Sequence, residues 1–222
     1  MPGLLSDSVR KQIGGLKLEA HRPLIICDAD EVLFQFVKSL DTWLRTRDHY
    51  LDLQSFAITG NIKHMETQVP WPADQIKALL KDFFIEGTRD EIPVPGAADA
   101  LQALTDIAQI VVLTNISETA HEARRAALIK CGMPYQVIAN EGAKGAAAMA
   151  LAERASRPVI FLDDLPPNIS SVRRGIPHAH IIHFIGDPHL ASLIGKAPDA
   201  NHRIDDWFEA GQVIRSIIEG HA

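Results

Sequence analysis

Short apolar runs alternate with segments of helical periodicity along most of the chain. Five apolar runs stand out, at residues 24–27, 110–113, 135–139, 159–162 and 179–184. Most of them are continuous rather than alternating, which is typical of strands that are covered on both faces of a sheet. The runs therefore predict five buried strands.

Apolar residues recur at helical spacing in the segments between and after these runs. The patterns predict helices over residues 97–108, 120–131, 144–154 and 207–218. The third of these is assigned mainly because it is rich in alanine, which favours helix. Strand and helix alternate in this way in α/β folds, so we expect a doubly wound, mostly parallel, Rossmann-like sheet.

One region breaks this alternation. It contains no convincing buried strand, but residues 39–47 and 74–84 have helical spacing. The segment Ile92-Pro93-Val94-Pro95-Gly96 is typical of a stiff linker that returns the chain to the sheet. We therefore expect a catalytic core formed by residues 1–36 and 93–222 and a small helical insertion formed by residues 37–92.

Polar residues stand at the predicted strand ends and at the start of one following helix. In chain order they are Asp28, Asp30, Thr114, Asn115, Lys144, Asp163 and Asp164. Ligands of open α/β sheets bind at the carboxyl ends of the strands. We therefore expect all of these side chains to converge on one edge of the sheet.

The chemistry of these residues is mutually consistent. Clustered carboxylates repel one another and need a cation, and oxygen ligands suit Mg²⁺. The hydroxyl of Thr114 and the ammonium of Lys144 can hold phosphoryl oxygens. One carboxylate can attack phosphorus, and another two residues later can move the proton. The set therefore predicts hydrolysis of a phosphate monoester.

The order Asp28-x-Asp30-x-Val32, Thr114, Lys144 and Asp163-Asp164 resembles the haloacid dehalogenase superfamily. The resemblance covers residues 24–171, and it implies that Asp28 is the nucleophile and Asp30 the general acid and base. It also implies a Mg²⁺ site formed by the Asp28 carboxylate, the Asp30 carbonyl and one acid of the last pair. We favour Asp164 as the direct ligand, with Asp163 assisting. The family often has a further polar group at the position of Asn168.

Position 30 narrows the expected reaction. Relatives that cleave carbon–halogen bonds lack an acid there, whereas an acid at this position is similar to phosphatases and phosphomutases. Glu31 departs from the glycine that the family commonly has directly after position 30.

The insertion resembles the helical cap of capped members, which implies a small phosphorylated metabolite as substrate. Within it, Gly60, Asn61, Lys63 and His64 form a polar stretch that could contact that substrate.

Three other functions use similar sets of residues, and the sequence argues against one of them. A phosphomutase or phosphotransferase would use the same core residues. A protein that has lost catalytic activity would retain them only for binding. A response-regulator receiver also uses acids, a threonine and a lysine, but it has its paired acids after the first strand. Here the pair Asp163-Asp164 follows the fourth.

Composition and charge exclude several other classes of protein. The net charge is −6, and basic residues cluster no further than the pairs Arg124-Arg125 and Arg173-Arg174, which we interpret as solvated helix faces. Nucleic acid is therefore not an expected partner. No apolar stretch approaches the ~20 residues of a membrane span, so no membrane association is expected. A cytoplasmic location follows by default, and the oligomeric state is left open.

Histidines gather near the last predicted strand, at His178, His180 and His183. The first two could share one strand face, which is a feature of some zinc sites. No cysteine accompanies them, and His183 falls on the opposite face. We therefore expect these histidines to have a structural role.

Overall fold

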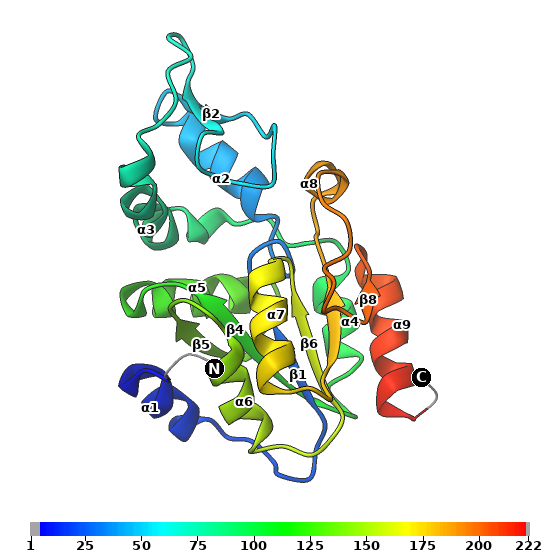
Figure 1. Ribbon diagram of the computed structural model, residues 1–222. Helices are drawn as coiled ribbons and strands as arrows, with labels where there is room; N and C mark the ends of the chain where they lie inside the picture. The colour runs from blue at the N-terminus through cyan, green and yellow to red at the C-terminus, as the bar shows by residue number, and fades with distance from the viewer. Residues whose placement is uncertain (1–4, 221–222) are drawn as a thin grey trace.

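A six-stranded parallel sheet forms the centre of the molecule, shown in the computed structural model of Figure 1, which describes residues 5–220. The strand order is β5-β4-β1-β6-β7-β8, and every neighbouring pair is parallel. The strands are β1 (Leu24–Cys27), β4 (Gln109–Asn115), β5 (Gln136–Asn140), β6 (Val159–Asp163), β7 (His180–His183) and β8 (His202–Arg203). This topology confirms the predicted doubly wound α/β fold.

Helices cover both faces of the sheet. One face packs on α4 (Ala97–Gln102), α5 (His121–Lys130) and α9 (Trp207–Ile218). The other packs on α1 (Asp7–Gly15), α6 (Gly145–Ala152) and α7 (Pro166–Gly175). Successive residues of a strand point to opposite faces. Accordingly, Ile25 and Cys27 of β1 belong to the first apolar core and Leu24 and Ile26 to the second, which explains the continuous apolar runs.

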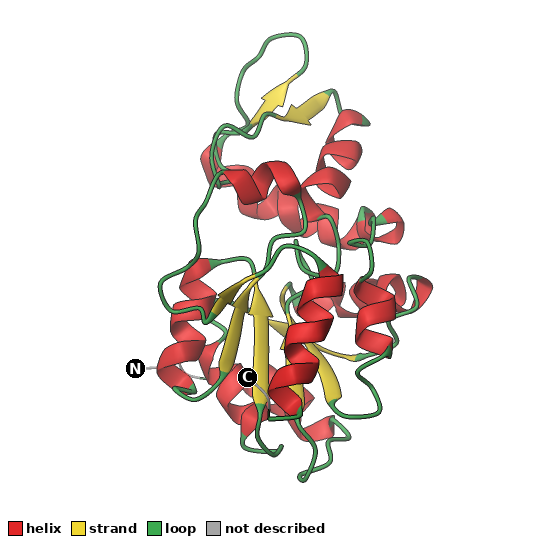
Figure 2. Ribbon diagram, turned by 90° about the vertical axis from the view of Figure 1, so that its right-hand side faces the viewer, coloured by secondary structure: helices red, strands yellow, loops and turns green. Residues whose placement is uncertain are grey.

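The region between β1 and α4 stands above the carboxyl edge of the sheet (Figures 1 and 2). Its elements are α2 (Phe36–Arg45), β2 (His49–Leu51), β3 (Ile62–His64), the 3₁₀ turns η1 (Ala73–Gln75) and η2 (Thr88–Asp90), and α3 (Ile76–Glu86). The two strands form an antiparallel pair, although no strand was predicted here. Each has only three residues, mostly half-buried, so neither carries an apolar run.

A third apolar cluster joins this region to the sheet edge. Phe36, Leu40 and Phe83 from the region between β1 and α4 belong to it, together with Ile116 and Ile185 from the core. The ring of Phe36 packs against that of Phe83 at a centroid distance of 5.6 Å. The short helix α8 (Pro188–Ser192) and the 3₁₀ turn η3 (Glu118–Ala120) lie at the same edge. The insertion is thus packed onto the edge at which parallel strands present ligands.

The predicted strands and helices agree with the observed ones to within a few residues. The bounds of β1 and α9 coincide with the prediction, whereas the predicted helix over 97–108 ends at Gln102 and continues as turns. Strand β8 was not predicted, because two residues at the sheet margin give no periodic signal. Among the helices of residues 5–220, none has the length and apolar character that crossing a membrane would require.

Candidate active site

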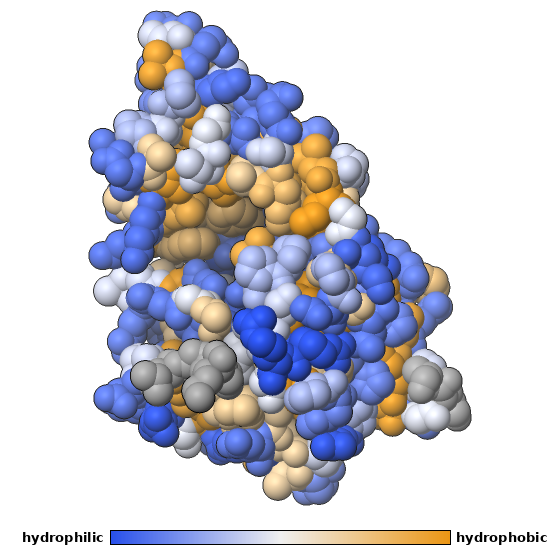
Figure 3. All heavy atoms as spheres, viewed as in Figure 1, coloured by the Kyte–Doolittle hydropathy of each residue, from blue (hydrophilic) through white to orange (hydrophobic). Residues whose placement is uncertain are grey.

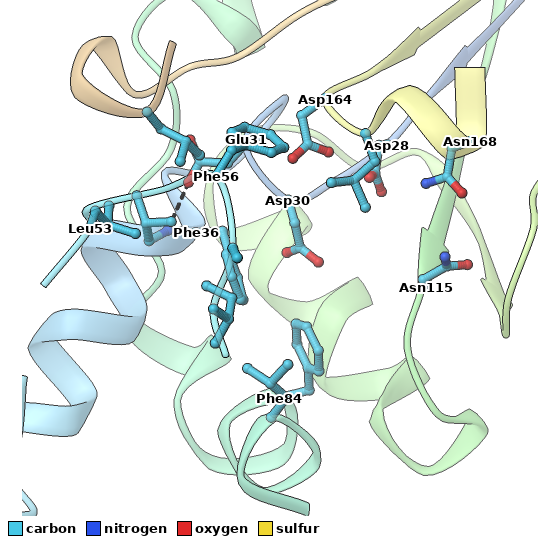
Figure 4. A pocket seen from close by; sticks show the side chains of 16 residues that line it. Asp28, Asp30, Glu31, Phe36, Leu53, Phe56, Phe84, Asn115, Asp164 and Asn168 are labelled. Atoms are coloured by element: carbon cyan, nitrogen blue, oxygen red, sulfur yellow. Dashed lines mark hydrogen bonds between the residues drawn. The ribbon is translucent and has the colours of Figure 1, made fainter. Parts of the chain in front are cut away.

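The polar residues predicted from the strand ends come together at the carboxyl edge of the sheet. Figure 4 shows Asp28, Asp30, Asn115 and Asp164 among them. Asp28 follows β1 directly, Thr114 and Asn115 end β4, and Asp163 ends β6. Lys144 is the residue that precedes the first turn of α6. Because β1 lies between β4 and β6 in the sheet, the residue after it is flanked by both neighbouring strand ends.

Lys144 is fully buried and joins two of the acids. Its Nζ lies 2.7 Å from Asp28 Oδ1 and 2.7 Å from Asp163 Oδ2. Burial acts to lower the pKa of Lys144, but Asp163 and Asp28 outweigh it and raise that pKa above its ordinary value. The lysine therefore stays charged and holds the two carboxylates at fixed positions.

The adjacent acids Asp163 and Asp164 have different surroundings. Asp163 accepts hydrogen bonds from Lys144, from the backbone N–H of Leu165 and from the Asn168 side chain. No hydrogen bond to the Asp164 carboxylate is found within residues 5–220, and Asp164 lines a cavity beneath the insertion whereas Asp163 does not. Asp163 is thus saturated by protein donors, and Asp164 is available to a ligand.

Both acids titrate above their ordinary range. Burial raises the pKa of Asp163 to about 6, with Lys144 opposing the shift and Asp28 adding to it. Burial, followed by the charges of Asp163, Asp28 and Glu31, raises the pKa of Asp164 well above its usual value. Repulsion of this kind is relieved when a cation binds.

Asp28, Asp163 and Asp164 form a compact cluster of carboxylates of the kind that attracts a metal ion, with Asp28 and Asp164 on the cavity and Asp163 bound to Lys144. Each offers a carboxylate oxygen, and these oxygens all lie within 4.8 Å of one another. Within the described part of the chain, no other group of histidine, cysteine and acidic side chains is so placed. Three buried oxygen donors with one lysine among them fit a hard divalent cation. The donor set therefore suits a metal site, as the sequence predicted, without specifying the ion.

Thr114 and Asn115 flank the acids on the β4 side. Thr114 is fully buried, and its Oγ1 has no hydrogen-bond partner among the residues described. A buried hydroxyl without a partner is costly unless a ligand completes it. Asn115 lines the cavity, and its amide is oriented by Asn140, whose Nδ2 donates to Asn115 Oδ1 at 2.7 Å.

Asp30 is held by a buried ionic network that the sequence did not reveal. Arg124 Nη2 lies 2.6 Å from Asp30 Oδ1, and Arg124 Nη1 lies 2.7 Å from Glu91 Oε2. Burial raises the pKa of Asp30 against the opposing charge of Arg124, and burial raises the pKa of Glu91 to about 7. Asp30 therefore retains a proton more readily than an exposed aspartate, while its position is fixed.

The interpretation of Arg124 as part of a solvated helix face is wrong. Its side chain is fully buried, whereas that of Arg125 is 54% exposed. Arg124 stands three residues before Ala127 and four before Leu128, both in the apolar core. That spacing places it on the buried stripe of α5, a signal that the sequence did contain.

Glu31 connects the loop that follows β1 to its surroundings. Its backbone has φ +57°, in the left-handed region that favours glycine. The buried side chain accepts hydrogen bonds from Val37 N at 2.7 Å and Asp187 N at 3.1 Å, and its carbonyl accepts one from Gly186 N at 2.6 Å. Burial raises the pKa of Glu31 to about 8. The departure from glycine therefore tethers the start of the insertion to the β7 side of the sheet edge.

A cavity of about 260 Å³ opens between the acids and the insertion. Its acidic side carries Asp28, Asp30 and Asp164, and Figure 4 shows phenylalanine rings on the opposite side. In Figure 3 the hollow lies between the upper and lower parts of the molecule and is bordered by apolar residues. Asn168 also lines the cavity, as expected for a further polar group of the site.

The polar stretch expected to contact substrate does not line this cavity. Asn61 is buried, and its side chain donates to the carbonyls of Ser55 and Ala57. Lys63 pairs with Asp52 at 2.6 Å. These side chains shape the 53–58 loop, and it is the loop's apolar residues that reach the cavity.

His183 has a structural role in the site. The N–H of Ala197 donates to His183 Nδ1 at 3.0 Å, so the ring proton is on Nε2. Nε2 then donates to the backbone carbonyl of Asp164 at 2.8 Å. Burial lowers the pKa of His183 and keeps the ring neutral. His183 therefore fixes the backbone of Asp164.

No protein-family model matches this chain, and no curated protein is similar to it in sequence. Solved structures are similar in fold. A haloacid dehalogenase-like protein of unknown function from Agrobacterium tumefaciens has a TM-score of 0.61 and 20% identity, covering 87% of this chain and 97% of its own. A HAD family hydrolase from Deinococcus radiodurans, with bound phosphate and sodium, has a TM-score of 0.57 and 17% identity over 90% and 98%.

An L-2-haloacid dehalogenase is also similar, with a TM-score of 0.56 and 12% identity, covering 87% of this chain and 99% of its own. The chain spans nearly the whole length of each of these proteins. The molecule therefore has the haloacid dehalogenase-like fold. Because hydrolases and a dehalogenase share that fold, the fold alone does not specify the reaction, which depends on the residues of the site.

Proposed function

We propose that this protein is a metal-dependent phosphoric monoester hydrolase of the haloacid dehalogenase type, with Asp28 as nucleophile and Mg²⁺ as the metal. The observation that carries the proposal is the cluster of Asp28, Asp163 and Asp164 around Lys144, with Asp30 on the same cavity. The similar hydrolase that binds phosphate together with a cation supports this choice of chemistry.

In the proposed mechanism Asp28 begins the reaction. A carboxylate oxygen of Asp28 attacks phosphorus, the bond from phosphorus to the ester oxygen breaks, and Asp30 donates a proton to the leaving alcohol. A water molecule then gives its proton to Asp30 and attacks the aspartyl-phosphate, which releases inorganic phosphate and restores Asp28. The raised pKa of Asp30 suits a group that must first donate a proton.

The other residues bind and orient. Asp28, Asp164 and the Asp30 carbonyl would hold the metal, which would supply charge neutralisation for the phosphoryl oxygens. Lys144 orients Asp28 through their 2.7 Å contact. With Asn115, the unpartnered hydroxyl of Thr114 would hold phosphoryl oxygens. Asp163 anchors Lys144 rather than the metal, in line with its saturated hydrogen bonds.

Two observations favour phosphate esters over 2-haloacids. An acid stands at position 30, where a leaving alkoxide needs a proton and a leaving halide does not. In addition, none of the 16 described residues that line the cavity is lysine or arginine. The carboxylate of a haloacid would therefore face Asp28, Asp30 and Asp164 without a cationic side chain.

Residues 37–92 form the cap in this proposal. Their apolar side chains close the cavity above the acids, and a cap of this kind excludes water and large substrates. A small phosphorylated metabolite is the substrate class that results. A phosphomutase would share this core, and transfer of labelled phosphate to an added sugar phosphate rather than to water would favour that alternative.

The test is phosphate release from a generic aryl phosphate, with Mg²⁺ and after removal of metal by a chelator. Wild-type activity should depend on Mg²⁺, and Asp28→Asn should lower kcat by at least about a thousandfold, since it removes the nucleophile. Asp106→Asn makes the same change at an exposed position just before β4, at the opposite edge of the sheet, and should leave activity unchanged. Full activity in Asp28→Asn would exclude the mechanism.

A further inference from the structure

The wall of the cavity opposite the acids is apolar. It is built by side chains from α2, from the 53–58 loop and from α3, with Leu190 of α8 beside them. Phe36, Phe56, Ile58 and Phe84 are among these side chains. Apolar walls favour apolar ligand groups, because hydroxyl groups placed against them lose hydrogen bonds to water without replacement.

The backbone of the 53–58 loop offers little to a polar ligand. The carbonyl of Leu53 accepts a hydrogen bond from His189 Nε2 at 3.0 Å. The carbonyls of Ser55 and Ala57 accept from Asn61 Nδ2 at 3.1 Å and 2.7 Å. These acceptors are thus already engaged within the protein, so the loop presents mainly its side chains to the cavity.

The charges that face the cavity are all acidic. They belong to Asp28, Asp30, Glu31 and Asp164. The buried cations Lys144 and Arg124 do not line the cavity. Lys144 is paired with Asp28 and Asp163. Arg124 is paired with Asp30 and Glu91. A substrate with a second phosphate or a carboxylate would find acids there and no cationic side chain.

We infer that the substrate is the phosphate monoester of a small, uncharged, apolar alcohol, with a short alkyl chain or a single ring, rather than a sugar phosphate. This inference rests on the proposed hydrolase function and specifies its substrate class. The cavity, about 260 Å³, is slightly smaller than the usual range for ligand sites, roughly 300–1,000 Å³. Hydrolysis consumes one water molecule and yields the free alcohol and inorganic phosphate.

The test compares propyl phosphate with glycerol phosphate, which have the same carbon skeleton and differ by two hydroxyl groups. With Mg²⁺ present, kcat/KM for propyl phosphate should be at least about tenfold higher, the size of effect that small apolar contacts produce in a pocket. Ethyl, propyl and butyl phosphate should follow in rising order. Intrinsic reactivity cannot produce this result, because glycerol is the better leaving group.

A pair of matched variants tests whether the cavity wall causes the preference for propyl phosphate over glycerol phosphate. Phe56→Ser removes one ring from the cavity wall and should reduce the ratio of kcat/KM for propyl over glycerol phosphate by about tenfold. Phe208→Ser makes the same change on α9, at a side chain that is 77% exposed and does not line the cavity. It should leave the ratio unchanged.

The outcomes separate the two claims. Magnesium-dependent turnover that is lost in Asp28→Asn, with glycerol phosphate or a hexose phosphate as good as propyl phosphate, would overturn the substrate class and leave the hydrolase proposal standing. An unchanged ratio in Phe56→Ser would also overturn it. Lack of turnover of every ester, including the aryl phosphate, would overturn both claims.

Discussion

Glu31 occupies a backbone conformation that glycine adopts at less cost. At φ +57° a side chain is strained, yet this carboxyl accepts two backbone N–H groups, from Val37 and Asp187. Two unpaired buried donors together cost about 2–6 kcal/mol, which exceeds the roughly 1–2 kcal/mol that glycine would recover in the left-handed region. The hydrogen bonds therefore outweigh the strain.

We predict that Glu31→Gly destabilises the protein by about 1–3 kcal/mol, because both N–H donors lose their acceptor while only the strain is relieved. Chemical denaturation at constant pH measures the difference. Asp48→Gly is the matched control: Asp48 has the same φ of +57° but is exposed, so this change should leave stability within about 1 kcal/mol of wild type. Equal effects of the two substitutions would rule out the tether.

At the scale of single residues, the sequence indicated what lies at the strand ends but not what surrounds it. Asp28, Lys144 and Asp164 were identified because each follows a strand or begins a helix. Arg124 and His183 act through contacts that join residues far apart in the chain, 94 positions in the case of Arg124 and Asp30. Such contacts depend on how helices pack on the sheet, and periodicity alone does not specify them.

At the scale of elements, α6 and α7 approach each other unusually closely. A Cβ on Gly145 would lie 2.4 Å from the carbonyl oxygen of Ser171, a backbone atom that cannot simply rotate away. The N–H of Gly145 also donates a hydrogen bond to the Ser171 hydroxyl oxygen at 3.0 Å. Because Lys144 immediately precedes Gly145, this close contact also sets the position of the lysine.

We predict that Gly145→Ala destabilises the protein by about 1–3 kcal/mol through overpacking, and lowers kcat because Lys144 shifts relative to Asp28. Thermal unfolding and the aryl phosphate assay measure the two effects. Gly14→Ala in α1 is the matched control, since nothing lies within 4 Å of its added Cβ, and it should be neutral or stabilise by up to about 1 kcal/mol. A fully active, stable Gly145→Ala variant would refute this account.

The elements themselves were largely predictable from the chain. The strands β1, β4, β5, β6 and β7 carry apolar runs because both their faces are buried, and α9 repeats its apolar residues at helical spacing. The pair β2–β3 was missed because pairing rather than burial defines it: His49 lies opposite His64, and both are only half-buried. The limits of the insertion, residues 37–92, remain a prediction.

At the scale of the whole molecule, the clustered acids couple metal binding to folding. The raised pKa of Asp164, caused first by burial and then by Asp163, Asp28 and Glu31, means that the metal-free fold loses stability as pH rises through that pKa. The sign follows because the folded state binds the proton more tightly than the unfolded chain. A cation that replaces the proton removes this loss.

We predict that Mg²⁺ at about 100 times its dissociation constant stabilises the protein by about 2.7 kcal/mol and raises Tm by roughly 5–10 °C. At one fixed Mg²⁺ concentration, the shift should be larger at about pH 8 than at about pH 5.5, where protons compete for the acids. Thermal unfolding with and without Mg²⁺ tests this. Asp164→Asn should abolish the shift and Asp106→Asn should retain it, and a shift of equal size at both pH values would contradict the linkage.

The loop at residues 53–58 separates the residues that contact the ligand space from those that maintain the loop's structure, which bears on how substrate recognition can evolve. Its apolar side chains contact the ligand space, while Asn61 and the Lys63–Asp52 pair, which lie outside the cavity, hold its backbone. Under the proposed function, mutations at Phe56 or Ile58 would therefore alter recognition without changing the acids proposed to perform the chemistry or the residues that maintain the loop. Single substitutions in this loop would then change the substrate that is preferred, with the strand ends left as they are.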